Sequence, residues 1–163
     1  MKYHTTLLED SVKYLYYDLG IYCPHQLDMM EIADYLGIKV YFLDISSRVY
    51  NNEIIIDSRL SPEQQWEDFG HELCHLLLQY GNQLLHLNNL FLKYQERKAN
   101  NFALHFCVPT FILLKYEIAN IPEGIHFITN TFNVTQEFAQ KRLIHFRNQL
   151  ELSKLHQQLN CYF

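Results

Sequence analysis

The sequence lacks any apolar segment long enough to cross a membrane. A spanning helix needs about 20 consecutive apolar residues, and the apolar pair Leu7-Leu8 near the start is cut short by Glu9-Asp10. We therefore expect neither a membrane span nor a signal peptide. Proline and glycine are also scarce, at 4 and 5 residues. With so few breaks, and no repeat or low-complexity tract, the helices and strands are expected to follow one another without a linker.

Paired cysteines and an excess of basic residues are absent as well. The four cysteines (Cys23, Cys74, Cys107 and Cys161) form no C-x-x-C pair and no compact spacing pattern, which favours a reduced, cytoplasmic compartment. Aspartate and glutamate outnumber lysine and arginine, 18 to 13, and the formal charge is −5. Direct binding to nucleic acid normally needs a basic stripe or patch, so we expect no nucleic-acid partner.

What the sequence does contain is enough apolar material for a substantial core. Apolar residues make up 48% of the 163 residues, and aromatic residues make up 15%. A chain of this length and composition is typical of one folded domain. We expect a single domain over 1–163, with a catalytic core over about 25–109 and a C-terminal helical part over about 110–163.

The spacing of apolar residues predicts a mainly helical chain with a small sheet. Helices are expected over residues 7–19, 27–36, 61–80 and 88–107, and again through most of 110–163. β-branched and aromatic residues predict strands within 38–43 and 48–56, with a hairpin turn at Asn51-Asn52. This order of elements indicates an α+β fold, and we expect its three-stranded sheet to be antiparallel or mixed.

One short motif carries chemical information. His71-Glu72-Leu73-Cys74-His75 fits the pattern H-E-x-x-H within the third expected long helix. Residues four apart on a helix lie one turn apart on the same face, so both imidazoles can bind one zinc ion while Glu72 acts as the general base. The alternative is a surface helix with two unrelated histidines. The position of the motif in mid-helix, after a strand-rich segment, argues against that alternative.

A catalytic zinc site needs a third protein ligand and leaves the fourth position open. The Met-turn pattern H-E-x-x-H-x-x-G-x-x-H would place that ligand at Gly81, which excludes the Met-turn class. His86, in the expected loop, remains an alternative. Glu96 is favoured, because an antiparallel helix after the loop would bring it back over the histidines. Taken alone, Glu96 would be read as an exposed charge beside Arg97 and Lys98.

The neighbours of Glu96 support its assignment as a ligand. Glu96 shares one stripe of its helix with the small residues Ala99 and Ala103, which would allow two helices to approach closely. Asn100 follows Glu96 by one turn and could orient a ligating histidine through the ring nitrogen that does not bind the metal. Partners of this kind fix the tautomer of a ligand. The sequence thus predicts a three-ligand zinc site with Asn100 behind it.

Together these motifs resemble the ImmA/IrrE family of phage- and mobile-element-associated peptidases, within the thermolysin-like clan. The segments that carry the resemblance are the H-E-x-x-H motif, Ile54-Ile55-Ile56-Asp57, Ser61-Pro62-Glu63-Gln64-Gln65, residues 96–103 and Val108-Pro109. Residues 134–143 also resemble the C-terminal helical hairpin of the family. Cys74 departs from the family pattern, which usually has glycine there. Its side chain could crowd the helix or touch the metal.

The resemblance implies a zincin-like minimal peptidase domain that binds Zn²⁺, in a cytoplasmic protein of bacterial or phage origin. Members of the family typically cut a cognate helix-turn-helix repressor, so the resemblance implies a protein substrate of that class. Two other hypotheses compete with a repressor-cutting peptidase. One is a metal-stabilised regulator that binds its partner without cutting it, which the intact Glu72 disfavours. The other is a DNA-binding regulator, which the acidic charge balance disfavours. The oligomeric state is left open.

Some further residues have a weaker claim to function. His105 and His126 are candidates for a donor to an oxyanion, although most such histidines are ordinary surface or core residues. The apolar face around Phe138 and Phe146 could be core, a dimer contact or a docking surface for the repressor. The buried face of the motif helix is predicted to comprise Trp66, Phe69, Leu73, Leu76, Leu77 and Tyr80.

Overall fold

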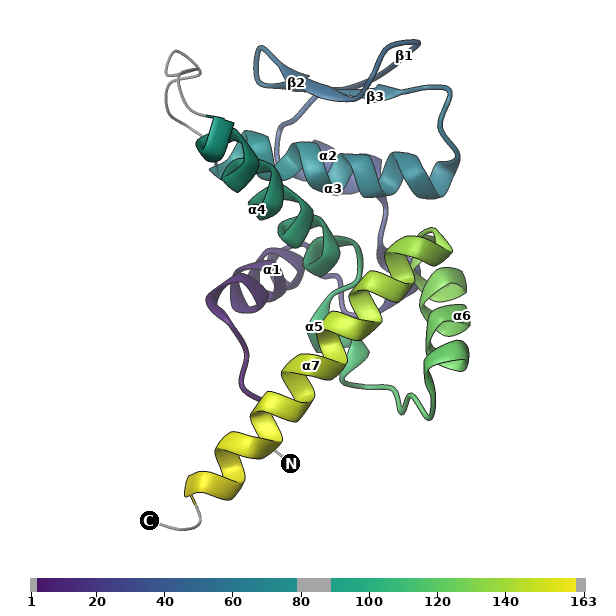
Figure 1. Cartoon of the computed structure of the whole chain (residues 1–163). Coiled ribbons are helices and arrows are strands. Elements are labelled where there is room, and N and C mark those ends of the chain that lie inside the picture. Colours follow the sequence, from purple (N-terminus) through teal and green to yellow (C-terminus); the bar gives the residue numbers. More distant parts are fainter. Residues whose placement is uncertain (1–2, 79–88, 161–163) are drawn as a thin grey trace.

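A small sheet lies across one side of a long helix, and the remaining helices pack beside and below that pair (Figure 1). The computed structural model of the chain describes residues 3–78 and 89–160. The elements are α1 (Leu7–Asp18), a 3₁₀ turn η1 (Pro24–Gln26), α2 (Met29–Tyr35), β1 (Val40–Leu43), β2 (Arg48–Tyr50), β3 (Glu53–Asp57), α3 (Pro62–Leu78), α4 (Asn89–Cys107), α5 (Thr110–Leu113), α6 (Ile121–Phe132) and α7 (Gln136–Asn160). The predicted α+β class is confirmed.

The sheet is mixed, with strand order β1-β3-β2. β1 pairs with β3 in parallel, whereas β2 and β3 form an antiparallel hairpin. The hairpin turns at Asn51 and Asn52, which have φ values of 50° and 61°. Asparagine tolerates this left-handed conformation better than most residues, and such a turn matches the twist of the two strands. The predicted hairpin is therefore confirmed.

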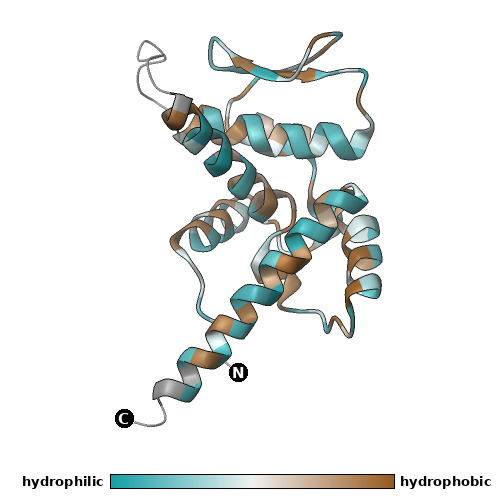
Figure 2. Ribbon diagram, in the orientation of Figure 1, coloured by the Kyte–Doolittle hydropathy of each residue, from teal (hydrophilic) through white to brown (hydrophobic). Residues whose placement is uncertain are grey.

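The core lies on both sides of α3. Ile54 and Ile56 of β3 are fully buried on the sheet side, and Phe69 and Leu73 of α3 are buried with them. One continuous cluster of buried side chains extends from α1 to α7. In Figure 2 the longer helices change between hydrophilic and hydrophobic colour around their axes, as amphipathic helices should. None of the helices in the described residues has the length and apolarity needed to cross a membrane.

The predicted buried face of the motif helix is largely confirmed. Four of its six residues are buried, namely Trp66, Phe69, Leu73 and Leu76. The prediction for Leu77 was wrong, because its side chain is 39% exposed, and Tyr80 lies outside the described residues. On α7, Phe146 is buried and Phe138 packs against the core. Phe146 therefore belongs to the core, and Phe138 packs against it while remaining partly accessible.

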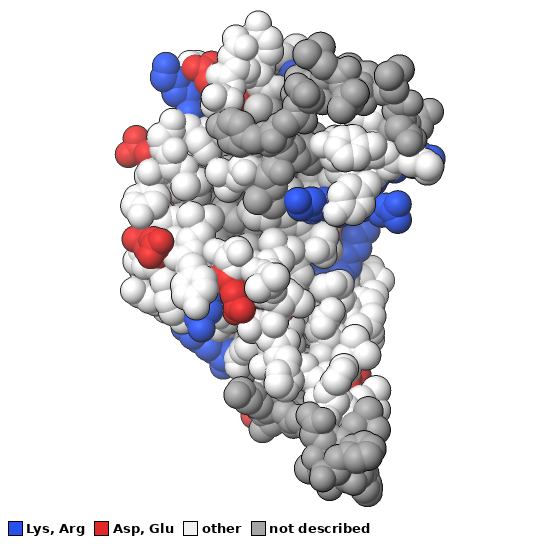
Figure 3. Space-filling view, turned by 90° about the vertical axis from the view of Figure 1, so that its left-hand side faces the viewer, with Lys and Arg blue, Asp and Glu red and all other residues white. Residues whose placement is uncertain are grey.

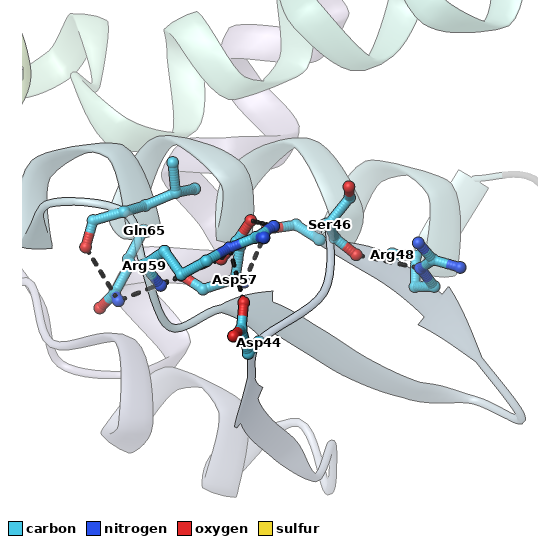
Figure 4. A network of polar contacts seen from close by, with 8 residues as sticks. Asp44, Ser46, Arg48, Asp57, Arg59 and Gln65 are labelled. Atoms are coloured by element: carbon cyan, nitrogen blue, oxygen red, sulfur yellow. Dashed lines mark hydrogen bonds and ion pairs between the residues drawn. The ribbon is translucent and has the colours of Figure 1, made fainter.

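A polar network fixes the start of α3 to the end of β3 (Figure 4). Arg59 donates two hydrogen bonds to the Asp57 carboxylate, at 2.8 and 2.7 Å, and forms an ion pair with Asp44 at 2.9 Å. The hydrogen bonds from Arg59 lower the pKa of Asp57 to about 2. Gln65 of α3 donates to the backbone oxygens of Asp57 and Leu60. The network therefore ties the helix that carries the H-E-x-x-H motif to the end of the central strand β3.

Candidate metal centre

The candidate metal centre lies where α3 and α4 pack closely against each other. A Cβ atom added to Gly70 would lie 2.9 Å from Cys107 Sγ and 3.2 Å from Phe106 Cδ1, so the helices could not approach as closely with a larger residue there. Ala99 and Ala103 of α4 are buried in the same interface, as their small size predicted. The sequence analysis missed Gly70, although a glycine inside a helix often has a packing reason.

Three predicted ligands converge at this contact. His75 Nε2 lies 2.9 Å from His71 Nε2, while Glu96 oxygens lie 3.2 Å from His71 Nε2 and 3.5 Å from His75 Nε2. Around a tetrahedral zinc ion with bonds of about 2.0–2.2 Å, ligand atoms are separated by about 3.3–3.6 Å. Within residues 3–78 and 89–160, these three form the one group of metal-binding side chains whose ligand atoms all lie within 4.8 Å of one another.

Asn100 lies behind the group, at its predicted place. Its Oδ1 atom is 3.1 Å from His71 Nδ1. A carboxamide oxygen can only accept a hydrogen bond, so Nδ1 of His71 carries the proton and Nε2 keeps its lone pair. That lone pair is directed to the space shared with His75 and Glu96. Burial and the neighbouring His75 lower the pKa of His71, against the opposite effect of Glu96. The neutral form of the ring, which metals bind, is thereby favoured.

Glu72 is half-buried beside the three converging side chains. Burial, assisted by the negative charges of Asp68 and Glu96, raises its pKa to about 7, although His75 and a backbone hydrogen bond from Val49 act in the opposite direction. A carboxylate with a pKa near neutrality is suited to taking and returning a proton. Asp68 and the Val49 N–H were missed by the sequence analysis. Asp68 precedes Glu72 by one helical turn, which could have drawn attention to it.

Other candidates from the sequence lie elsewhere or outside the described residues. Cys74 is fully buried in the core cluster and is not one of the converging side chains, and burial raises its thiol pKa to about 11. His105 is buried with Glu9 and Thr110. His126 is close to Asn130 on α6. His86, the alternative ligand, lies outside the described residues.

The donor set fits zinc. Two imidazole nitrogens and one carboxylate form a common ligand set of catalytic zinc, with the fourth position left for water or substrate. The histidines are mostly buried, with 21% and 18% of their side chains exposed, whereas the side chain of Glu96 is 57% exposed. The group is thus held by the core on one side and open on the other. Such an arrangement can bind a divalent cation and present it to a second molecule.

Comparisons with known proteins add a family context. Residues 33–144 match the peptidase family described as IrrE N-terminal-like domain. The chain is 43% identical over 169 residues to the phage-like element PBSX protein XkdA of Bacillus subtilis (strain 168), covering 95% of this chain and 85% of that protein. It is also 34% identical over 157 residues to the uncharacterized protein YqaB of the same organism, covering 90% of this chain and 88% of that protein. The matched region contains the H-E-x-x-H motif, Glu96 and Asn100.

Proposed function

The chain belongs to the IrrE N-terminal-like domain family, and on that premise we propose that it is a zinc-dependent endopeptidase that cuts a helix-turn-helix repressor. The observation that carries the proposal is the convergence of ligand atoms from His71, His75 and Glu96, at separations of 2.9–3.5 Å, beside Glu72. The converging side chains come from two helices that are separate in sequence. If the two histidines on α3 were unrelated to a metal, there would be no reason for the Glu96 carboxylate of α4 to lie beside both of them.

In this proposal His71, His75 and Glu96 hold the zinc, and Asn100 keeps the tautomer of His71 that can bind it. When bound, zinc supplies a Lewis acid that activates water near neutral pH and stabilises negative charge on the substrate carbonyl. Both functions need an accessible position, and the exposed side of Glu96 provides one. The other side of both histidine side chains is buried, with 21% and 18% of their surface exposed.

Glu72 is the proposed general base and acid. Its carboxylate takes a proton from the attacking water and then gives that proton to the amine that leaves when the peptide bond breaks. In the metal-free chain, burial raises the pKa of Glu72 above its usual range, so its carboxyl group can hold a proton in this environment. The backbone N–H of Val49 on β2 favours the charged form of this carboxylate, so the sheet contributes to the environment of the base.

The family context supports a repressor as the proposed substrate. The 43%-identical relative is named for a phage-like element, and regulation of such an element requires inactivation of the protein that silences it. A repressor acts in the cytoplasm, so the same proposal places this chain there. The chain, whose net charge is −5, does not need to bind DNA itself, because in this proposal the protein that it cuts binds the DNA.

The test is a cleavage assay on the zinc-loaded chain. The substrates are the repressor encoded beside its gene, an unrelated helix-turn-helix repressor and casein, each with and without a zinc chelator. We expect chelator-sensitive cutting of the neighbouring repressor alone. Rapid cutting of casein would contradict the narrow specificity. Binding of the repressor without cutting, by a chain that holds zinc, would instead favour the non-catalytic regulator.

A further inference from the structure

The first half of α4 carries basic side chains next to the candidate metal centre. Lys93, Arg97 and Lys98 are all exposed, and we refer to these three residues as the basic face. Figure 3 shows basic groups to the right, near the place where α4 begins, and others at the upper and lower left, whereas most acidic groups on this side of the molecule lie to the left. This local excess of positive charge occurs in a chain whose net charge is −5.

The side chains of the basic face form no ion pair within the described part of the chain. No ion pair described within residues 3–78 and 89–160 includes Lys93, Arg97 or Lys98, whereas Lys141 and Lys154 each have a carboxylate partner on their own helix. The one hydrogen bond described for the three side chains runs from Arg97 Nε to the backbone oxygen of Lys93, at a long 3.4 Å. The three cations are therefore available to an external partner.

The basic face does not help the helix that carries it. Like charges four residues apart, such as Lys93 and Arg97, destabilise a helix. The first turn of α4 also has no acidic residue to offset them. Alternating acidic and basic residues at these positions would give a more stable helix. A function outside the fold is a physical reason to keep three cations within six positions.

The basic face is adjacent to the stripe of α4 that contributes to the metal centre. At about 100° per residue, Asn100 lies about 40° around the helix from Glu96, with Lys93 at about 60° and Arg97 at about 100° in the same direction. Lys98, at about 200°, continues the basic face around the helix, away from the metal centre. Lys93 and Arg97 form the rim between the candidate metal centre and solvent. A chain segment that reaches the fourth position of the metal would therefore pass close to Lys93 and Arg97.

Exposed aromatic side chains lie on the solvent side of α4, at about 160° (Tyr94) and about 220° (Phe91) around the helix from Glu96, where they flank Lys98. Phe91 and Tyr94 of α4 are 47% and 59% exposed. Arginine and aromatic residues are enriched at protein interfaces, whereas a surface for a phosphate backbone would be expected to carry more cations in a longer stripe. The mixture favours a polypeptide over a nucleic acid as the partner.

We propose that the basic face and the aromatic side chains beside it form a docking surface for an acidic segment of the protein substrate. The proposal rests on the proposed function, because it places the partner at the same site. Complementary charge would guide the acidic segment to the rim and fix the chain direction beside the candidate metal centre. The substrate class is thereby narrowed to proteins with a cluster of aspartate or glutamate near the cleaved bond.

The test uses binding without cutting. Zinc-loaded Glu72→Gln protein is used to select from a displayed library of random peptides of about twelve residues, and the selected consensus peptide is then synthesised. We expect enrichment of aspartate and glutamate. Affinity for the consensus peptide should fall at least about tenfold in a K93E/R97E/K98E variant made in the same background, and should also fall with rising salt. Circular dichroism and zinc content of each variant verify that the fold and the metal site are retained.

A matched variant, K39E/K141E/R147E, changes the net charge by the same amount at exposed positions elsewhere. It should retain the wild-type affinity within about twofold. Selection of neutral or basic peptides, or equal loss of affinity in the two triple variants, would overturn the proposal. Tighter binding of a double-stranded DNA fragment than of the acidic peptide would assign the basic face to nucleic acid and overturn it as well. Because the assay measures binding alone, a failure of cleavage would not affect its outcome.

Discussion

Two groups of histidine and glutamate side chains within residues 3–78 and 89–160 have opposite surroundings. In the candidate metal centre, three ligand atoms face one another across 2.9–3.5 Å and one side is open. The second group, which we term the Glu9 network, comprises Glu9, His105, Thr110 and Arg142. Its Glu9 oxygen accepts hydrogen bonds from Thr110 Oγ1 at 2.6 Å and Tyr3 OH at 2.7 Å. All four members of the network are buried.

The comparison shows that residue types alone do not identify a site. In the Glu9 network, Arg142 Nη2 donates to Thr110 Oγ1 at 2.7 Å and Nε donates to the Val108 oxygen at 3.0 Å, so the protein supplies its own cation. Burial and the charge of Arg142 lower the pKa of His105 to about 3, which keeps the ring neutral. In the candidate metal centre, no lysine or arginine within the described ion pairs serves this purpose. A metal ion fits the missing positive charge.

The largest expected difference between the two groups is catalytic. Glu72→Gln should reduce the rate of cleavage by about 10²–10⁴-fold, because an amide cannot take the proton of the water, while zinc content stays at one ion per chain. Glu9→Gln should leave the rate per folded molecule close to the wild-type value. Cleavage rates with the repressor, measured beside zinc content, would check both variants. A Glu72→Gln enzyme that cuts at the wild-type rate would remove the general-base assignment.

The second difference concerns stability. Arg142→Met removes the buried cation of the Glu9 network and leaves a buried carboxylate without its balancing charge, which typically costs about 3–5 kcal/mol. His71→Ala, tested in zinc-free protein, should cost much less, because the ring is partly exposed. Urea unfolding of the zinc-free proteins measures both free energies. An equal loss of unfolding free energy in the two variants would show that the Glu9 network does not stabilise the fold more than the partly exposed His71 does.

A third prediction concerns the metal affinity. Asn100→Ala removes the acceptor for the His71 Nδ1 proton, and such losses typically weaken metal binding about 10–100-fold. Asn101→Ala, at the next and exposed position of α4, is the matched control and should bind zinc normally. Competition with a chromophoric chelator gives the dissociation constants. An unchanged constant for Asn100→Ala would mean that the hydrogen bond does not fix the ligand.

The smallest expected effect is a dependence of stability on pH, carried by the Glu9 network. His105 has its pKa lowered from 6.5 to about 3 in the folded chain. Between those values the unfolded chain binds more protons, so stability is full above pH 6.5 and is lost as the pH falls. The pKa of Glu9 is lowered as well, which extends the loss to more acid pH. The raised pKa of Glu72 acts in the opposite direction over this interval, so the effect is read as a difference between two zinc-free proteins. Between pH 7 and pH 5, the wild type should lose about 1–2 kcal/mol relative to His105→Gln.

The sequence predicted those features that depend on short-range spacing. The two histidines lie one turn apart on α3, and Glu96 and Asn100 lie one turn apart on α4, so helical periodicity was sufficient to group each pair. An antiparallel helix after the loop was then expected to place Glu96 and Asn100 beside the two histidines. The hairpin at Asn51-Asn52 followed from the tolerance of asparagine for the left-handed conformation.

The features that were missed depend on contacts between distant segments. Glu9 and Thr110 are 101 positions apart, and nothing in either local sequence indicates that they meet. The hydrogen bond of Val49 to Glu72 requires the sheet to lie on α3, which the element order suggested only in outline. The burial of Phe146 could not be decided from the sequence for the same reason. An amphipathic helix shows that one face is apolar but does not show what covers that face.

The measurement that tests the central claim most directly is zinc X-ray absorption spectroscopy on the chain loaded with one equivalent of the metal. The account predicts four light-atom ligands at about 2.0–2.2 Å, including the signature of two imidazole rings and no sulfur. The His71→Ala variant should bind less zinc. Any zinc that it still binds should show the signal of at most one imidazole ring. A sulfur ligand at about 2.3 Å, which would implicate Cys74, or a chain that binds no zinc, would contradict the account.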